Sequence, residues 1–432
     1  MEMRSGDTIV ALSSGTPPSG VAVIRLSGPR VPEILQAVCG GVPEPRRLVL
    51  RPIGQDSLLD RGLVAYFPAP HSFTGEDCAE LQVHGSPAGV RAILRLLTKL
   101  GARLAEAGEF TRRAFENGKL DLVEIEGLGD LLDAETENQR RQALARFEGG
   151  LSQRIDAWRH QLLDLRAEIE ARLDFSDEGD VADALPDSFG DNILELQADI
   201  AAALASAEYG RIVREGIRVA LAGAPNAGKS SLLNALARSD IAIVTDEAGT
   251  TRDVREVPLD INGQLYVLLD LAGLRDADSK AEAEGVRRAR LAIEQADIVL
   301  WLSAPDIAEE DDALRRKASL RIGTKGDLGP SGDFDLTVSA RSGSGLDALL
   351  AAIERLGQEL ASGEPALISR ERDRLALAAA IAALTAAQQQ LAAPELAAES
   401  LRIASQALER LIGRIDAERV LDRLFASFCI GK

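Results

Sequence analysis

The chain has 432 residues, of which 46% are hydrophobic and 27% are charged, and its formal net charge at pH 7 is -19. This length accommodates two or three domains with separate cores, and the apolar runs are shorter than the roughly 18 to 20 residues of a membrane span. The acidic balance argues against bulk attraction to nucleic acid, because phosphate neutralisation by Lys and Arg supplies most non-specific affinity. We therefore expect no membrane span, a cytoplasmic location, and RNA contacts that are local or supplied by a partner.

The first predicted domain comprises residues 1–118. Short β-rich runs, among them VAVIRLSG and CAELQVHG, alternate with Gly/Pro turns and with one apolar-periodic helix near residues 87–101. This pattern predicts a compact α+β domain. Cys39 and Cys78 lack the paired spacing of a zinc site or a disulfide framework, so we expect both to be small buried hydrophobic residues.

A discontinuous all-α domain with an inserted α/β domain is predicted for the remainder. Residues 119–212 and 366–432 carry apolar residues at spacings of three and four, with an interruption at Pro394, as expected for helices. Residues 213–365 begin with the apolar run IRVALAG and continue as alternating strand-like and helix-like segments. That alternation is typical of a parallel α/β sheet.

A phosphate-binding motif lies at the start of the inserted domain. Residues 223–230, GAPNAGKS, match G-x-x-x-x-G-K-[ST] between a predicted strand and a predicted helix. The glycines let backbone N–H groups surround the β-phosphate, Lys229 neutralises β/γ charge, and the Ser230 hydroxyl is placed to bind Mg²⁺. The sequence therefore predicts a P-loop of a Ras-like fold.

Two later segments complete the phosphate side. Thr251, in the segment GTTRD, occupies the position of a first switch, where it can reach Mg²⁺ and the γ-phosphate only when GTP is bound. Asp270 ends the apolar strand LYVLLD and can hold the Mg²⁺ shell, while the Gly273 N–H contacts the γ-phosphate. Their order and spacing predict a GTPase.

A guanine-recognition segment, TKGD, occupies residues 324–327. Asp327 can accept two hydrogen bonds from the ring N–H and the amino group of guanine, and so selects guanine over adenine. The first residue of this motif is usually Asn, and Thr324 cannot donate and accept as an amide does, which predicts weaker nucleotide binding. Residues 339–341, Ser-Ala-Arg, add a backbone donor near the guanine oxygen.

The residue that orients the attacking water is not evident from these motifs. Ras-like proteins use a Gln just after the second switch glycine, and this chain has Leu274 there, which cannot hydrogen-bond to water. Carboxylate chemistry leaves four candidates open, namely Asp276, Asp278, Glu282 and Glu284.

Taken together, eight segments resemble the MnmE (TrmE) family of tRNA modification GTPases, within the TrmE-Era-like group of P-loop GTPases. They are GAPNAGKSSLLNAL, IVTDEAGTTRD, DLAGLR, DTIVAL, VIRLSGP, SFTGED, NGKLDL and FCIGK, and they span the whole chain. The resemblance implies an N-terminal α+β domain that dimerises and binds folate, a discontinuous helical domain, and an inserted GTPase domain.

The resemblance also implies a reaction. Members act with an FAD-containing partner, MnmG (GidA), to add a carboxymethylaminomethyl-type group to C5 of the wobble uridine, position 34, of certain tRNAs. A tetrahydrofolate derivative, 5,10-methylene- or 5-formyl-tetrahydrofolate, supplies the one-carbon unit, and FAD belongs to the partner only. GTP binding is expected to pair the GTPase domains of a homodimer.

Family residues for hydrolysis can be placed on this chain. A K⁺ ion replaces the arginine finger in the family, and its contacts correspond to Asn226, Thr245, Glu247 and Thr250. The family pattern Glu-x-x-Gly assigns water orientation to Glu282, with Glu284 as a close alternative. The predicted GTP-binding set, from motifs and resemblance together, is Asn226, Ala227, Gly228, Lys229, Ser230, Ser231, Thr245, Thr250, Thr251, Asp270, Gly273, Lys325, Asp327, Ser339, Ala340 and Arg341.

The folate contacts implied by the resemblance are Arg25, Glu80, Lys119 and Lys432. A carboxylate suits the amide-like pterin edge, and Arg or Lys suits the anionic glutamate tail of folate. Cys429 matches the family cysteine, which places it near the folate and the modification centre with a catalytic role. Packing of the C-terminal tail is the alternative interpretation of this residue.

Two other functional classes share part of this pattern. A ribosome-assembly GTPase of the Era or Der type has the same P-loop and switch segments, but such proteins are typically basic and carry an RNA-binding domain after the GTPase domain. A folate-binding aminomethyltransferase without nucleotide function would be favoured only by a degenerate P-loop, and the P-loop here is intact.

Overall fold

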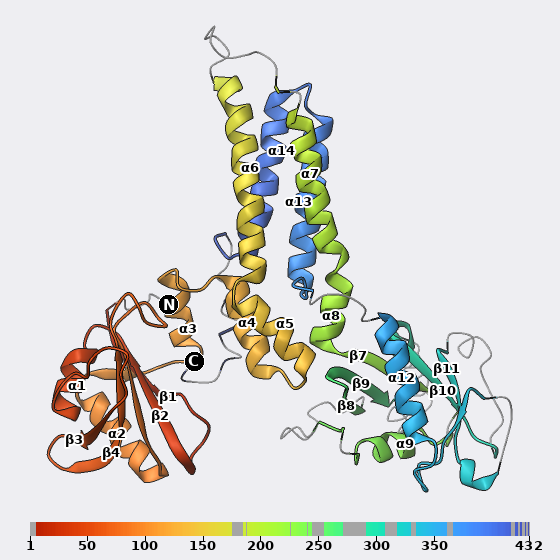
Figure 1. The fold of residues 1–432 in the computed structure, drawn as a ribbon, viewed down its shortest axis with the longest axis horizontal. Coiled ribbons are helices and arrows are strands. Elements are labelled where there is room, and N and C mark those ends of the chain that lie inside the picture. Colours follow the sequence, from red (N-terminus) through yellow and green to blue (C-terminus); the bar gives the residue numbers. More distant parts are fainter. Residues whose placement is uncertain are drawn as a thin grey trace, which may run out of the picture. The chain divides into compact units, whose positions relative to one another are not determined.

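The computed structural model describes residues 6–174, 185–186, 188–224, 226–239, 241–243, 255–270, 291–306, 318–329, 334–360, 366–415, 420–421, 424–425, 428 and 431. The chain divides into two compact units, Met1–Gly129 with Gln406–Lys432, and Asp130–Ser405. Figure 1 shows the elements of both.

The first unit is built on a six-stranded sheet of order β3-β4-β5-β2-β1-β6. The neighbouring strands are antiparallel except for the parallel pair β1 and β6. The strands are β1 (Thr8–Leu12), β2 (Ser19–Ser27), β3 (Val49–Gly54), β4 (Leu58–Phe67), β5 (Cys78–Gly85) and β6 (Ala102–Leu104). The helices are α1 (Val31–Cys39), α2 (Pro87–Lys99), α3 (Glu109–Glu116) and α4 (Leu122–Asp133).

Alternation along the strands separates the two faces of this sheet. In β5, Ala79, Leu81 and Val83 are buried in a core shared with α1 and α2, so Glu80 and Gln82 lie on the opposite face. On that opposite face, Phe110 of α3 packs with Ile9 and Ala11 of β1. The face without α1 and α2 therefore carries both polar side chains and a small apolar cluster.

The C-terminal residues belong to this first unit. Phe425 and Phe428 pack with Leu122 and Ile125 of α4. The Ser13 hydroxyl, just after β1, donates to the carbonyl of Gly431 at 2.8 Å. The end of the chain is thus anchored beside the N-terminal sheet.

Long helices form much of the second unit. They are α5 (Glu137–Phe147), α6 (Gly150–Asp174), α7 (Ser188–Ala205), α8 (Ala207–Glu215), α13 (Glu371–Gln389) and α14 (Pro394–Leu411). Helices α6, α7, α13 and α14 run side by side (Figure 1), burying rows of Leu, Ile and Ala. The expected break at Pro394 is confirmed, since α14 begins there.

The second sheet has the order β12-β11-β10-β7-β9-β8 and is parallel except at the edge strand β8. Its strands are β7 (Ile217–Ala222), β8 (Arg255–Ile261), β9 (Gln264–Asp270), β10 (Ile298–Ser303), β11 (Leu320–Gly323) and β12 (Leu336–Thr337). The associated helices are α9 (Lys229–Leu236), the 3₁₀ helix η2 (Gly326–Leu328) and α12 (Leu346–Leu360). Helices α9 and α12 contribute to the main core of this α/β part.

The expected fold class is confirmed: an α+β part, a discontinuous helical part and an α/β part of Ras-like order. The three domain boundaries expected from the sequence stay a prediction, because the two compact units divide the helical part differently. Cys39 and Cys78 are buried as expected, and burial raises the pKa of Cys39 to about 11. Among the described residues, no helix is both long enough and apolar enough to cross a membrane.

Candidate functional site

The loop between β7 and α9 has the backbone geometry of a phosphate cradle. Gly223 has φ +134°, and a Cβ there would lie 2.1 Å from the carbonyl oxygen of Leu302, so only glycine fits. Gly228 precedes α9 with φ 92°, and Asn226 also adopts a left-handed conformation, with φ 61°. Backbone N–H groups at a helix N-terminus that follows such a loop are suited to bind an anion.

Lys229 is buried at the first position of α9. Its Nζ donates to the carbonyl oxygens of Gly223 at 2.6 Å and Ala224 at 2.8 Å. Those bonds hold the ammonium group over the loop. An incoming phosphate can replace neutral carbonyl acceptors with charged ones, which form stronger hydrogen bonds with a cation.

Ser230 and Asp270 meet at the Mg²⁺ side of the loop. The Ser230 hydroxyl donates to Asp270 Oδ2 at 2.7 Å, and Asp270 is buried at the carboxyl end of β9. A hydroxyl and a carboxylate at this distance form an all-oxygen donor set of the kind that Mg²⁺ prefers. The partner residues Thr245, Glu247, Thr250, Thr251, Gly273 and Glu282 lie outside the described residues.

The guanine side is assembled from η2 and the residues after β12. Ser339 is buried, and its hydroxyl donates to Asp327 Oδ1 at 2.8 Å. That bond lowers the pKa of Asp327, and the charge of Arg341 contributes. Lys325, with φ 54°, pairs through Nζ with Asp306 at 2.7 Å. Asp327 is therefore held as an oriented carboxylate.

Thr324 has a role that the sequence alone did not reveal. Its hydroxyl lies 2.6 Å from the carbonyl oxygen of Ala227 and 3.1 Å from that of Ser303, and its single proton is shared between these two acceptors. The residue is buried against Gly228. Thr324 thus links the guanine-recognition segment directly to the phosphate loop, as a hydroxyl rather than an amide. Of the remaining predicted residues, Ser231 is exposed on α9 and Ala340 is half-buried after Ser339.

A second site candidate lies on the first sheet. Arg25 of β2 is the register partner of Glu80 of β5, and its Nε and Nη2 donate to Glu80 Oε1 at 3.1 and 2.9 Å. The register places Ala11 beside Arg25 and Ala65 beside Glu80 on the same face. The ion pair is partly buried, with side-chain exposures of 25% for Arg25 and 24% for Glu80.

Two aromatic rings contact the Arg25 guanidinium. The ring centroids of Phe73 and Phe110 lie 5.7 and 5.8 Å from its Cζ atom. Lys119 is exposed after α3, and its stem lies against Gly75, where a Cβ would be 3.3 Å from Lys119 Cγ. The structure thus brings Arg25 and Glu80 into direct contact and places Lys119 close to the loop that carries Phe73. Lys432 and Cys429 lie outside the described residues.

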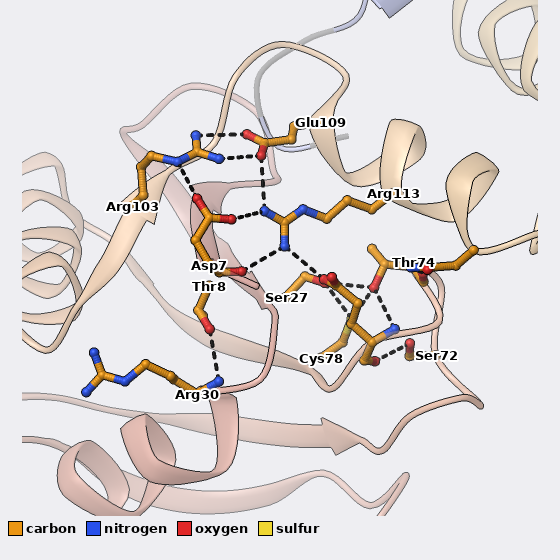
Figure 2. A network of polar contacts seen from close by, with 12 residues as sticks. Asp7, Thr8, Ser27, Arg30, Ser72, Thr74, Cys78, Arg103, Glu109 and Arg113 are labelled. Atoms are coloured by element: carbon orange, nitrogen blue, oxygen red, sulfur yellow. Dashed lines mark hydrogen bonds and ion pairs between the residues drawn. The ribbon is translucent and has the colours of Figure 1, made fainter. Parts of the chain in front are cut away.

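A polar network surrounds the loop SFTGED, residues 72–77. Figure 2 shows that Asp7 and Glu109 lie between two arginines, and that Arg103 and Arg113 each form ion pairs with both acids. Asp7 and Glu109 have lowered pKa values because hydrogen bonds from the arginines outweigh the opposing effect of burial. Sequence reasoning treated the loop only as a family signature and missed this network. Within the described part of the chain, no cluster of three or more His, Cys, Asp or Glu side chains is suited to hold a metal ion.

Comparisons with known proteins match nearly the whole chain. The family model described as GTP-binding protein TrmE N-terminus matches residues 8–119, and the model described as MnmE helical domain matches residues 122–429. A tRNA modification GTPase MnmE of Azorhizobium caulinodans is 52% identical over 436 residues, covering 99% of this chain and 100% of the relative. One of Rhizobium johnstonii is 50% identical over 436 residues, covering 99% of each. Among solved structures, the G domain of the T. maritima FeoB iron transporter aligns with 33% of this chain and 99% of that domain, at 25% identity and a TM-score of 0.26.

Proposed function

This chain belongs to the MnmE family of tRNA modification GTPases, and we propose that it adds a carboxymethylaminomethyl-type group to C5 of the wobble uridine of certain tRNAs. The proposal includes an FAD-dependent MnmG (GidA) partner and a tetrahydrofolate one-carbon donor. The observation that carries it is the coexistence of two assembled sites in one chain, Ser230 with Asp270 and Arg25 with Glu80.

The nucleotide site supports GTP binding with Mg²⁺. Lys229 would bind β- and γ-phosphate oxygens, and Ser230 with Asp270 would hold the metal shell. Mg²⁺ bound there would neutralise charge that develops on the phosphates. Asp327, oriented by Ser339, would accept the guanine N–H groups. Thr251 and Gly273 would contact the γ-phosphate.

Hydrolysis is proposed to depend on a monovalent cation. Asn226 projects from a left-handed position in the phosphate loop, and with Thr245, Glu247 and Thr250 it would bind K⁺. A cation there would offset charge between the β- and γ-phosphates, as an arginine finger does. Glu282 would orient the attacking water.

Different residues of the proposed folate site would bind the pterin ring and the glutamate tail. Arg25 donates from both Nε and Nη2 to Oε1 of Glu80, so the guanidinium orients the carboxylate and Oε2 would accept N–H groups of a pterin. Lys119, with Lys432, would bind the glutamate tail of folate. Cys429 would act near the modification centre, since its neighbours Phe428 and Gly431 are both packed in the same unit.

The assembly follows from the same family membership. We propose a homodimer formed through the N-terminal domain, GTP-dependent pairing of the GTPase domains, and a complex with MnmG and tRNA in the cytoplasm. Pairing of GTPase domains would place each cation site at an interface and so couple hydrolysis to dimer geometry.

GTP turnover in KCl and in NaCl at equal ionic strength tests the proposal. We expect turnover at least about 10-fold faster in KCl, because a bound cation stabilises the transition state, and loss of that difference in Asn226→Ala. Asn192→Ala, an exposed change on α7, is the matched control and should keep the K⁺ response. Equal rates in both salts for the unmodified chain would overturn the role of Asn226 and favour a ribosome-assembly GTPase.

A further inference from the structure

The polar side chains of the SFTGED loop form hydrogen bonds to several neighbouring elements. The Thr74 and Ser27 hydroxyls are 2.7 Å apart, which ties the loop to β2. Asp77 accepts from the Tyr66 hydroxyl of β4 at 2.8 Å. Glu76 Oε2 accepts from Ser27 Oγ at 2.7 Å and from Arg113 Nη1 at 2.9 Å. Surface loops are ordinarily mobile and solvated, so this degree of internal bonding indicates that the position of the loop matters.

Arg113 is the buried centre of these contacts. Its side chain is only 10% exposed and, besides Glu76, it bonds to Asp7 Oδ1 at 2.6 Å and to Glu109 Oε1 at 3.2 Å. A desolvated guanidinium is costly unless its charge and its N–H groups are satisfied, and loss of one partner leaves that cost uncompensated. The Glu76–Arg113 pair therefore fixes the loop to α3 firmly.

The loop and α3 each carry one of the two rings that contact Arg25. Phe73 lies in the loop three residues before Glu76, and Phe110 lies one helical turn before Arg113. A second bond joins the loop to the residue that caps the C-terminus of α3, since Asn117 Nδ2 donates to the carbonyl oxygen of Thr74 at 2.7 Å. A shift of the loop relative to α3 would move one ring against the other around Arg25.

We propose that the Glu76–Arg113 pair is a positioning device for the pterin-binding site. By locking the loop to α3, it holds Phe73 and Phe110 against Arg25, and Arg25 in turn holds Glu80 through Oε1, so that Oε2 can accept from a reduced pterin. Glu76 and Arg113 act through these residues and need not touch the ligand. The inference rests on the folate site proposed above.

Titration of the full chain with 5-formyl-tetrahydrofolate tests this inference by calorimetry. Glu76→Gln keeps the size of the side chain and removes its charge, and we expect the Kd to rise about 10-fold because the site loses preorganisation. The readout that separates positioning from general stability is a double-mutant cycle. In a Phe73→Leu background, Glu76→Gln should change the Kd little further, because the ring through which it acts is gone.

Matched variants make each failure distinguishable. Ile93→Val, a core truncation in α2 on the other face of the sheet, should lower the melting temperature about as much as Glu76→Gln does. It should nevertheless leave the Kd unchanged. If Glu76→Gln does not fold, Asn117→Ala removes the second bond between loop and α3 and should weaken binding in the same direction. Unchanged binding by Glu80→Ala would refute the folate site itself. The positioning role alone would be overturned if Glu80→Ala strongly weakened folate binding while Glu76→Gln and Asn117→Ala did not. Additive effects of Glu76→Gln and Phe73→Leu on the Kd would overturn it as well.

Discussion

Thr324 shows how one hydroxyl can replace the usual amide at the start of a guanine-recognition segment. An Asn amide has two N–H donors and a carbonyl acceptor, whereas Thr324 has one hydroxyl proton, which it shares between the carbonyl oxygens of Ala227 and Ser303. Both acceptors are backbone carbonyls, so a donor is all that the link to the phosphate loop requires. The expectation of weaker nucleotide affinity, drawn from the absence of an amide at this position, stays a prediction.

Removal of this hydroxyl is expected to weaken nucleotide binding. Thr324→Val keeps the branched shape but leaves the Ala227 carbonyl without this donor, which should raise the Kd for GDP about 10-fold, or about 1.4 kcal/mol. Fluorescent GDP titration measures the change. Thr324→Ser retains the hydroxyl and is the control; equal losses in both variants would show that the methyl packing, not the hydrogen bond, matters.

The candidate residues differ in how far their positions could be predicted from the sequence. Lys229 and Ser230 belong to one contiguous motif whose local backbone builds the site, so their placement follows from the motif itself. Thr324 and Ala227 are 97 positions apart, and Arg25 and Glu80 are 55 apart. Alternation in VAVIRLSG and CAELQVHG assigns Arg25 and Glu80 to the polar faces of their strands, but the strand order that pairs them is set by tertiary packing.

At the scale of elements, β1, the SFTGED loop and α3 are joined by an acidic and basic network rather than by apolar packing alone. Asp7 precedes β1, while Glu109 and Arg113 lie on α3. No periodicity in the sequence signals this network, because its members lie in four separate segments: the residue before β1, the SFTGED loop, β6 and α3. What the sequence did predict, a compact α+β domain, came from the alternation of the strands and the helix near residues 87–101.

This network predicts an acid-sensitive N-terminal part. Hydrogen bonds from the arginines hold the pKa values of Asp7 and Glu109 below their unfolded values of about 4, despite burial. Their contribution to stability is therefore fully present above about pH 4.5 and is lost as the pH falls through the folded pKa values, because the unfolded state then binds more protons. Hydrogen exchange of peptides covering β1 and α3 between pH 6 and pH 3 should show falling protection, after correction for intrinsic rates.

The double variant Asp7→Asn, Glu109→Gln provides the comparison for that measurement. It should be less protected at pH 6, since Arg113 and Arg103 lose their charged partners, and its protection should change less with acidification. An unaltered acid slope in the double variant would assign the sensitivity to other carboxylates.

At the scale of the whole chain, insertion of one domain into another requires the chain to cross from the helical part into the α/β part and back again. Helix α5 contacts both of these crossing segments. Gln142 Nε2 donates to the carbonyl oxygen of Gly210 on the entering side at 3.1 Å and to that of Ala366 on the returning side at 2.7 Å. One turn later, Arg146 forms a fully buried pair with Asp373 at 2.9 Å and also donates to the Leu367 carbonyl. Helix α5 thus holds together two segments that lie more than 150 residues apart.

Helix α5 also contacts the start of β9, the strand that ends at the Mg²⁺ side of the phosphate loop. Asn138 N donates to the carbonyl oxygen of Gly263 at 3.0 Å, and its side chain bonds to Gln264, the first residue of β9. Asp270 is the last residue of that strand. The helical part is therefore linked by one continuous strand to Asp270, the residue proposed to hold the Mg²⁺ shell with Ser230.

Loss of the hydrogen bonds from Gln142 to the two crossing segments is expected to destabilise the inserted domain. Gln142→Leu fills the same space but removes a buried donor from two carbonyls, at a cost of about 1–3 kcal/mol in unfolding free energy. Urea unfolding measures this cost, and hydrogen exchange should rise together in residues 207–215 and 366–370, because both segments lose the same partner. Gln358→Leu, an exposed change on α12, is the control. Faster exchange in only one of the two segments would show that the crossings are stabilised independently and that α5 does not join them.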